Sequence, residues 1–103
     1  MAIKRFRHKG LKAFFETGST RGINSEHADT IADILDFLEA SHHPADMKAI
    51  FRSRFSEKKG SGEGVYSIEV NGNWRITYEL SDEGAIVVDY RDYHGKQIKK
   101  RSK

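Results

Sequence analysis

The chain of 103 residues contains no cysteine, a single proline and no long run of apolar residues. Without cysteine it has neither a disulfide framework nor a thiolate site. The lack of a long apolar stretch excludes a membrane-spanning helix of the usual kind. The basic N-terminal residues 1–12 also lack the apolar segment that a signal peptide requires. These absences favour a soluble, cytoplasmic protein with one small core.

The charged residues are arranged in blocks of alternating sign. Residues 25–46 carry six acidic side chains and no lysine or arginine, whereas residues 47–62 carry five basic side chains and one acidic one. The net charge of +3 therefore hides oppositely charged parts of the chain. Either these blocks form two separate surfaces, of which the basic one suits phosphate, or they are chance clusters on a solvated surface.

The first half of the chain shows helical periodicity. Residues 9–16 have apolar side chains at helical spacing, which predicts a short helix. Asn24 can cap a second helix that extends to about Ala40, with an apolar stripe toward the core and acidic residues on the outer face. A helical turn should begin at Pro44 and run to Met47.

Two other segments, residues 1–6 and 51–55, have the alternating pattern of short strands. In the second of these, Arg52 and Arg54 alternate with Phe51, Ser53 and Phe55, which predicts that both arginines lie on one face of a strand. A last strand is expected at residues 85–90.

A hairpin is predicted around Asn71-Gly72, between two runs of alternating apolar residues. Asn-Gly is typical of a two-residue turn, but such a turn would place Arg75 opposite Ile68. A three-residue loop, 71–73, places Ile76 opposite Ile68. Because the apolar face decides the register, we expect the longer loop. The order of elements predicts an α+β fold, with two N-terminal helices packed on one face of a twisted, mainly antiparallel sheet.

Three groups of polar residues stand apart from the predicted core. They are Arg75 within a strand, Asp92, Tyr93 and His94 at the end of the last strand, and the basic residues Arg52, Arg54, Lys58 and Lys59. Metal-free cleavage of RNA needs a proton acceptor, a proton donor and a cation beside the phosphorane. Histidine, aspartate, tyrosine and arginine can supply these functions. From the residues alone, an exposed sheet arginine and an ordinary strand end fit the same positions.

The remaining motifs give no sign of a cofactor or a metal. His8, His27 and His42-His43 show no metal-ligand spacing and are interpreted as surface residues. The glycine-rich residues 60–64 lack the features of a phosphate loop and predict a hairpin loop. The basic tail 95–103 is predicted to be disordered, with non-specific phosphate contact as its sharpest role.

Several sequence blocks occur in a characteristic order. They are FRHKGL at 6–11, FFETG at 14–18, SI at 67–68, VNGNWRI at 70–76 and DYRDYH at 89–94. In this order and spacing they resemble the HigB-type toxins of the RelE/ParE toxin–antitoxin superfamily. We therefore expect one toxin domain over residues 1–94, followed by the tail.

The resemblance implies a RelE-like fold and a ribosome-dependent endoribonuclease that cleaves messenger RNA without a metal. It maps Arg75, Asp92, Tyr93 and His94 onto the active site, and Lys58 and Lys59 onto a basic loop. It also implies neutralisation by a HigA-like antitoxin with a helix-turn-helix. Operator DNA would be bound only through the complex with that antitoxin.

One departure from the family pattern concerns proton transfer. Some members carry a catalytic histidine just before the Lys-Gly loop, where this chain has Ser56. Either His94 carries the proton chemistry largely alone, or the activity is weak. Two alternatives stay open: a ParE-like toxin that poisons gyrase without cutting RNA, and a degenerate module that only binds the antitoxin.

Overall fold

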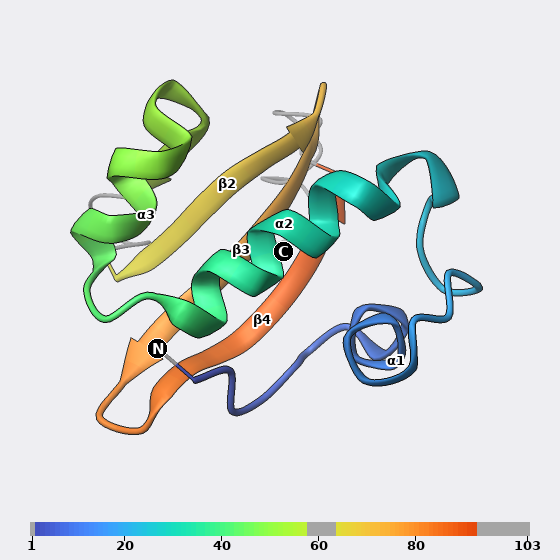
Figure 1. Ribbon diagram of the computed structural model, residues 1–103, viewed down its shortest axis with the longest axis horizontal. Helices are drawn as coiled ribbons and strands as arrows, with labels where there is room; N and C mark the ends of the chain where they lie inside the picture. Colours follow the sequence, from blue (N-terminus) through green and yellow to red (C-terminus); the bar gives the residue numbers. More distant parts are fainter. Residues whose placement is uncertain (1, 58–63, 93–103) are drawn as a thin grey trace, which may run out of the picture.

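A computed structural model describes residues 2–57 and 64–92, which form an α+β fold (Figure 1). Helices lie on one face of a four-stranded antiparallel sheet whose strands follow the order of the sequence. The strands are β1 (Phe55–Glu57), β2 (Val65–Asn71), β3 (Trp74–Ser81) and β4 (Gly84–Asp92). The helices are α1 (Lys9–Thr17), α2 (Ala28–Ala40) and α3 (Pro44–Phe51), with 3-10 turns η1 (Ser25–His27) and η2 (Arg52–Arg54). The predicted fold class is confirmed.

Within the described ranges, no helix has the length and apolar character needed to cross a membrane.

The first two helices begin and end near their predicted positions. His8 caps α1, because its Nδ1 accepts a hydrogen bond from the Leu11 N–H at 3.0 Å. Gly18 ends the helix in the left-handed conformation that glycine adopts readily. Asn24 caps η1, which leads directly into α2. The predicted helix from Asn24 to Ala40 is therefore present, with a 3-10 first turn.

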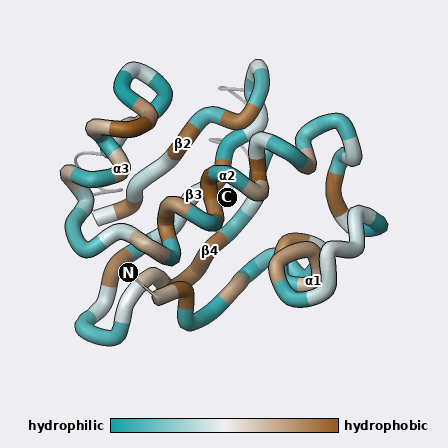
Figure 2. Tube along the Cα trace, in the orientation of Figure 1, coloured by the Kyte–Doolittle hydropathy of each residue, from teal (hydrophilic) through white to brown (hydrophobic). Residues whose placement is uncertain are grey.

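The core lies between α2 and the sheet. Helix α2 lies across the sheet (Figure 1), and both the helix and the strands carry apolar segments (Figure 2). Burial of these side chains removes apolar surface from water and drives the packing of the two layers. The fully buried residues of this interface include Ile31, Ile34, Leu35, Leu38, Ile68, Ile76, Tyr78 and Val88.

The β2–β3 hairpin has the predicted register but a different loop. Ile68 lies opposite Ile76, as the apolar pattern requires. The chain reaches this register with a bulge between Glu69 and Asn71, and Asn71 then pairs with Trp74 across a two-residue turn. The predicted three-residue loop is wrong, because the bulge accommodates the extra residue that we assigned to the loop.

The strand predicted over residues 51–55 is also wrong. Phe51 ends α3, Arg52–Arg54 form η2, and β1 begins only at Phe55. Met47 and Phe51 are both buried and lie four residues apart, which is the spacing of one helix face. The predicted helical turn from Pro44 therefore continues to Phe51, and Arg52 and Arg54 do not share the face of a strand.

The predicted N-terminal strand forms two isolated parallel bridges along the outer edge of β4. Ile3 pairs with Ala85 and Phe6 with Val88. Strand β4 has a bulge beside Val87, whose φ is +53°. Because of this bulge, Ala85 and Val88, which are three residues apart, can both pair with the N-terminal segment at this edge. The N-terminal segment therefore covers a sheet edge that would otherwise expose backbone groups.

We expect Gly10→Ala to destabilise the protein, although glycine to alanine in an exposed helix normally stabilises by about 1 kcal/mol. A Cβ at Gly10 would lie 2.4 Å from the carbonyl oxygen of Gly22, so α1 would have to move away from the loop before α2. The measurement is thermal unfolding, with Lys12→Ala as an exposed control in the same helix. A melting temperature of Gly10→Ala at or above that of the wild type would contradict this contact.

Candidate active site

The face of the sheet opposite the helices carries two rows of polar side chains. Residues that lie directly opposite each other in antiparallel strands share a face. One row consists of Glu69, Arg75 and Arg91, and the next consists of Ser56, Ser67, Thr77 and Asp89. We call these seven residues the polar face.

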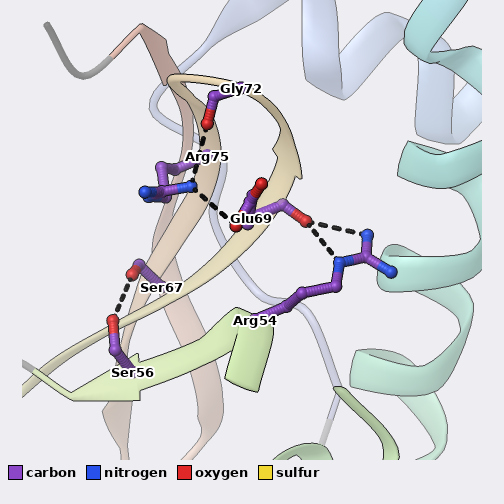
Figure 3. Close-up of polar contacts among 6 residues, drawn as sticks. All are labelled: Arg54, Ser56, Ser67, Glu69, Gly72 and Arg75. Atoms are coloured by element: carbon purple, nitrogen blue, oxygen red, sulfur yellow. Dashed lines mark hydrogen bonds and ion pairs between the residues drawn. The ribbon is translucent and has the colours of Figure 1, made fainter. Parts of the chain in front are cut away.

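Arg75 lies in the middle of the polar face. Its Nη1 is 3.6 Å from Oε1 of Glu69 and donates a hydrogen bond of 3.3 Å to the carbonyl oxygen of Gly72 (Figure 3). The side chain is 28% exposed, so an anion from solution can reach it. A guanidinium presents its donors in a planar fork that matches phosphate.

Asp89 and Arg91 also belong to this face, and neither was identified as a site residue from the sequence. Nε of Arg91 donates to Oδ2 of Asp89 at 3.1 Å, and Oδ1 of Asp89 accepts from the backbone N–H of Tyr90 at 2.9 Å. Arg91 lies directly opposite Arg75. Counting back from the β3–β4 turn without the bulge beside Val87 would pair Arg75 with Tyr90, so plain alternation does not place Arg91 beside Arg75.

The row of Ser56, Ser67, Thr77 and Asp89 contains Ser56, the position where the sequence resemblance led us to look for a histidine. Oγ of Ser56 and Oγ of Ser67 are 2.9 Å apart and join β1 to β2 (Figure 3). Ser67 and Thr77 are buried. Serine does not exchange a proton near neutral pH as histidine does. The described part of the polar face therefore contains carboxylates and arginines but no imidazole.

Asp92, predicted to act with Arg75, lies at the same end of the sheet but on its helix-facing side. Asp92 pairs with Trp74, whose ring stacks on the ring of Tyr90 with 4.6 Å between the two ring centroids. The structure thus brings Arg75 and Asp92 onto neighbouring strands without placing their side chains on one face. Tyr93 and His94 lie outside the described residues.

Of the four predicted RNA-binding residues, Arg52 and Arg54 lie within the described structure. Arg54 donates hydrogen bonds of 3.1 and 2.8 Å to the carbonyl oxygen of Glu69, and its guanidinium lies over the ring of Phe51. Figure 3 shows it on the other side of β2 from Arg75. Arg52 is exposed in η2. Lys58 and Lys59 lie outside the described residues.

A buried aromatic cluster surrounds Tyr90 on the helix side of the sheet. His27 was expected on the surface, but it is only 4% exposed and its Nδ1 is 2.7 Å from the Tyr90 hydroxyl. The same hydroxyl accepts a hydrogen bond from the Asn24 N–H at 3.4 Å. Burial raises the pKa of Tyr90 above its ordinary value. This cluster joins the start of the second helical segment to the end of β4, close to Asp92.

Helices on one face of a four-stranded antiparallel sheet, with a polar opposite face, form an α+β fold of the kind expected for a RelE-like toxin. Residues 4–94 match the family described as RelE-like toxin of type II toxin-antitoxin system HigB. The chain is also 38% identical over 93 residues to Endoribonuclease HigB of Proteus vulgaris, an alignment that covers 89% of this chain and 99% of that relative. The chain therefore belongs to the HigB-like family of toxins from type II toxin–antitoxin systems.

We expect Tyr90→Phe to lower the free energy of unfolding by about 1–3 kcal/mol, because it leaves the buried Nδ1 of His27 without its partner hydroxyl. The matched control is Tyr78→Phe. The Tyr78 hydroxyl is buried and makes no hydrogen bond within the described residues, so its removal should be neutral or stabilising. Urea unfolding of both variants tests the cluster, and equal losses of stability would contradict it.

Proposed function

We propose that this toxin is an endoribonuclease that cleaves messenger RNA on the ribosome, without a metal, through attack by the RNA 2′-hydroxyl. The observation that carries the proposal is Arg75, a solvent-accessible arginine on the polar face of a HigB-like toxin. The name of the Proteus vulgaris relative, an endoribonuclease, supports the same reaction.

In the proposed reaction the 2′-oxygen forms a bond to the adjacent phosphorus while the bond from phosphorus to the 5′-oxygen breaks. A base takes the proton of the 2′-hydroxyl, and an acid protonates the leaving 5′-oxygen. Arg75 stabilises the negative charge of the phosphorane. His94 and Asp92 carry the protons, with Asp92 acting from the end of β4 because its side chain lies on the helix-facing side of the sheet, and Tyr93 orients the nucleotide. The products are a 2′,3′-cyclic phosphate and a 5′-hydroxyl.

The proposed partners follow from this reaction and from the family. A HigA-like antitoxin with a helix-turn-helix neutralises the toxin, and operator DNA is bound only through their complex. The toxin acts in the cytoplasm, where ribosomes and messages are found. Arg52, Arg54, Lys58 and Lys59 contact phosphates of the ribosome or message, although the Arg54 guanidinium also holds η2 against β2.

Expression of the toxin in cells, followed by mapping of RNA 5′ ends, tests the proposed function. New ends within translated messages, with 5′-hydroxyl and cyclic phosphate termini, are expected. Accumulated DNA breaks without cleavage of messages would instead indicate a ParE-like toxin. Absence of toxicity would indicate a module that binds the antitoxin but has little activity. The observation that favours this second candidate is the Ser56–Ser67 pair, which stands in place of a histidine.

Arg75→Ala and His94→Ala should each abolish toxicity while the protein remains folded. Loss of a group that stabilises the transition state costs on the order of a thousandfold in rate. Arg21→Ala is the control for Arg75→Ala, because it removes the same charge from the exposed loop between α1 and α2. A folded and fully toxic variant would exclude the altered residue from the reaction.

Neutralising Lys58 and Lys59 together should weaken binding to ribosomes most at low salt. For each lysine that binds a phosphate, neutralisation should reduce the log–log salt slope by roughly one unit or a little less. Affinities for ribosomes and for the antitoxin, measured over a salt series, test this expectation. Unchanged ribosome binding with loss of antitoxin binding would assign these lysines to the antitoxin interface.

A further inference from the structure

Two arginines lie directly opposite each other on the polar face. Arg75 of β3 and Arg91 of β4 are register partners, so both side chains leave the same face of neighbouring strands. Their side chains are 28% and 35% exposed, which keeps both accessible to solvent. Nothing in the sequence resemblance assigned a role to Arg91.

Like charges placed directly opposite each other in a sheet destabilise it. Here each arginine is flanked by a carboxylate, Glu69 at 3.6 Å from Arg75 and Asp89 at 3.1 Å from Arg91. The two carboxylates offset the repulsion without separating the arginines, because Glu69 lies on the far side of Arg75 from Arg91 and Asp89 lies along β4 in the next row. The arrangement keeps two cations adjacent at the centre of the face.

The flanking carboxylates also restrain the two guanidiniums. Arg75 is held by Glu69 and by the Gly72 carbonyl, and Arg91 is held by Asp89, which is itself only 13% exposed and fixed by the Tyr90 N–H. Side chains that are held before a ligand arrives lose less conformational entropy on binding. Two restrained and solvent-accessible guanidiniums on neighbouring strands offer several N–H donors to the oxygens of a single phosphate.

We propose that Arg75 and Arg91 form one phosphate-binding site, in which both arginines contact the same phosphate of an RNA strand. This inference rests on the proposed function for its ligand, because it names RNA as the source of the phosphate. It adds Arg91 as a second substrate-binding residue and makes the two arginines a coupled unit.

The test is a double-mutant cycle on binding of a single-stranded RNA with 2′-O-methyl groups at every position, which cannot be cleaved by 2′-hydroxyl attack. Arg75→Gln and Arg91→Gln should each lower affinity by about tenfold or more, the scale of one charge-assisted hydrogen bond. Because both contact one phosphate, the double variant should lose clearly less than the product of the two single losses. Arg21→Gln combined with Arg75→Gln should give a simple product.

Arg91→Gln keeps a donor for Asp89 and removes one of the two like charges that lie opposite each other. Its melting temperature should therefore equal or exceed that of the wild type. If Arg91→Gln instead failed to fold, Arg91→Lys would take its place in the cycle, with loss of the planar fork but not of the charge. Three results would each overturn the proposal. They are an unchanged affinity of the Arg91 variant, a loss of affinity in the double variant equal to the product of the two single losses, and no binding of this RNA by the wild type. Coupled losses in a toxin that leaves translated messages uncut would refute the proposed function but not the phosphate site.

Discussion

Packing of helix α2 against the sheet is the interaction on which the rest of this structure depends. Its buried stripe, which includes Ile31, Leu35 and Leu38, covers one face of the sheet and determines which residues of each strand point inward. Every second residue of β3, and of β4 beyond its bulge, is thereby committed to the opposite face. The positions of Arg75 and Arg91 are therefore consequences of where the apolar residues are placed, and a register slip of one residue would bury both charges.

This constraint explains which parts of the fold could be predicted from sequence. The hairpin register was predictable because only one pairing of Ile68 keeps the apolar residues together. The bulges after Glu69 and beside Val87 were not predictable. A bulge changes the length of a loop, or the face on which the following strand residues lie, without changing the apolar pattern. The segment at Phe51 was misassigned because Phe51 and Phe55 fit both a strand and the end of a helix, and burial of Met47 favours the helix.

The site was predictable in part for the same reason. Arg75 was identified because a charged residue interrupts a strand of apolar and aromatic neighbours. Arg91 and Asp89 were overlooked because each is ordinary in sequence and becomes notable only when β4 is aligned with β3. His27 was misjudged because its burial depends on a hydrogen bond to Tyr90, which is 63 residues away along the chain. Such long-range partners leave no local pattern.

The charge blocks left open whether the chain has two differently charged surfaces, and the described residues show a charged surface for the acidic block only. The acidic residues of α2, among them Asp29, Asp33 and Asp36, are exposed on the helix side of the molecule. The polar face is not strongly basic in its described part, because the two arginines are balanced by Glu69 and Asp89. The proposed recognition of phosphate there therefore relies on the placement of the guanidiniums rather than on net charge.

The central claim is that the RNA phosphate bound by Arg75 lies on the polar face and not on the outer face of α2. Backbone chemical shifts of the toxin, recorded with and without a non-cleavable single-stranded RNA, test it most directly. The account predicts shifts at Ser67, Thr77 and Arg91, with little change at Asp33 on the outer face of α2. Shifts concentrated on α2, with an unaffected polar face, would contradict it.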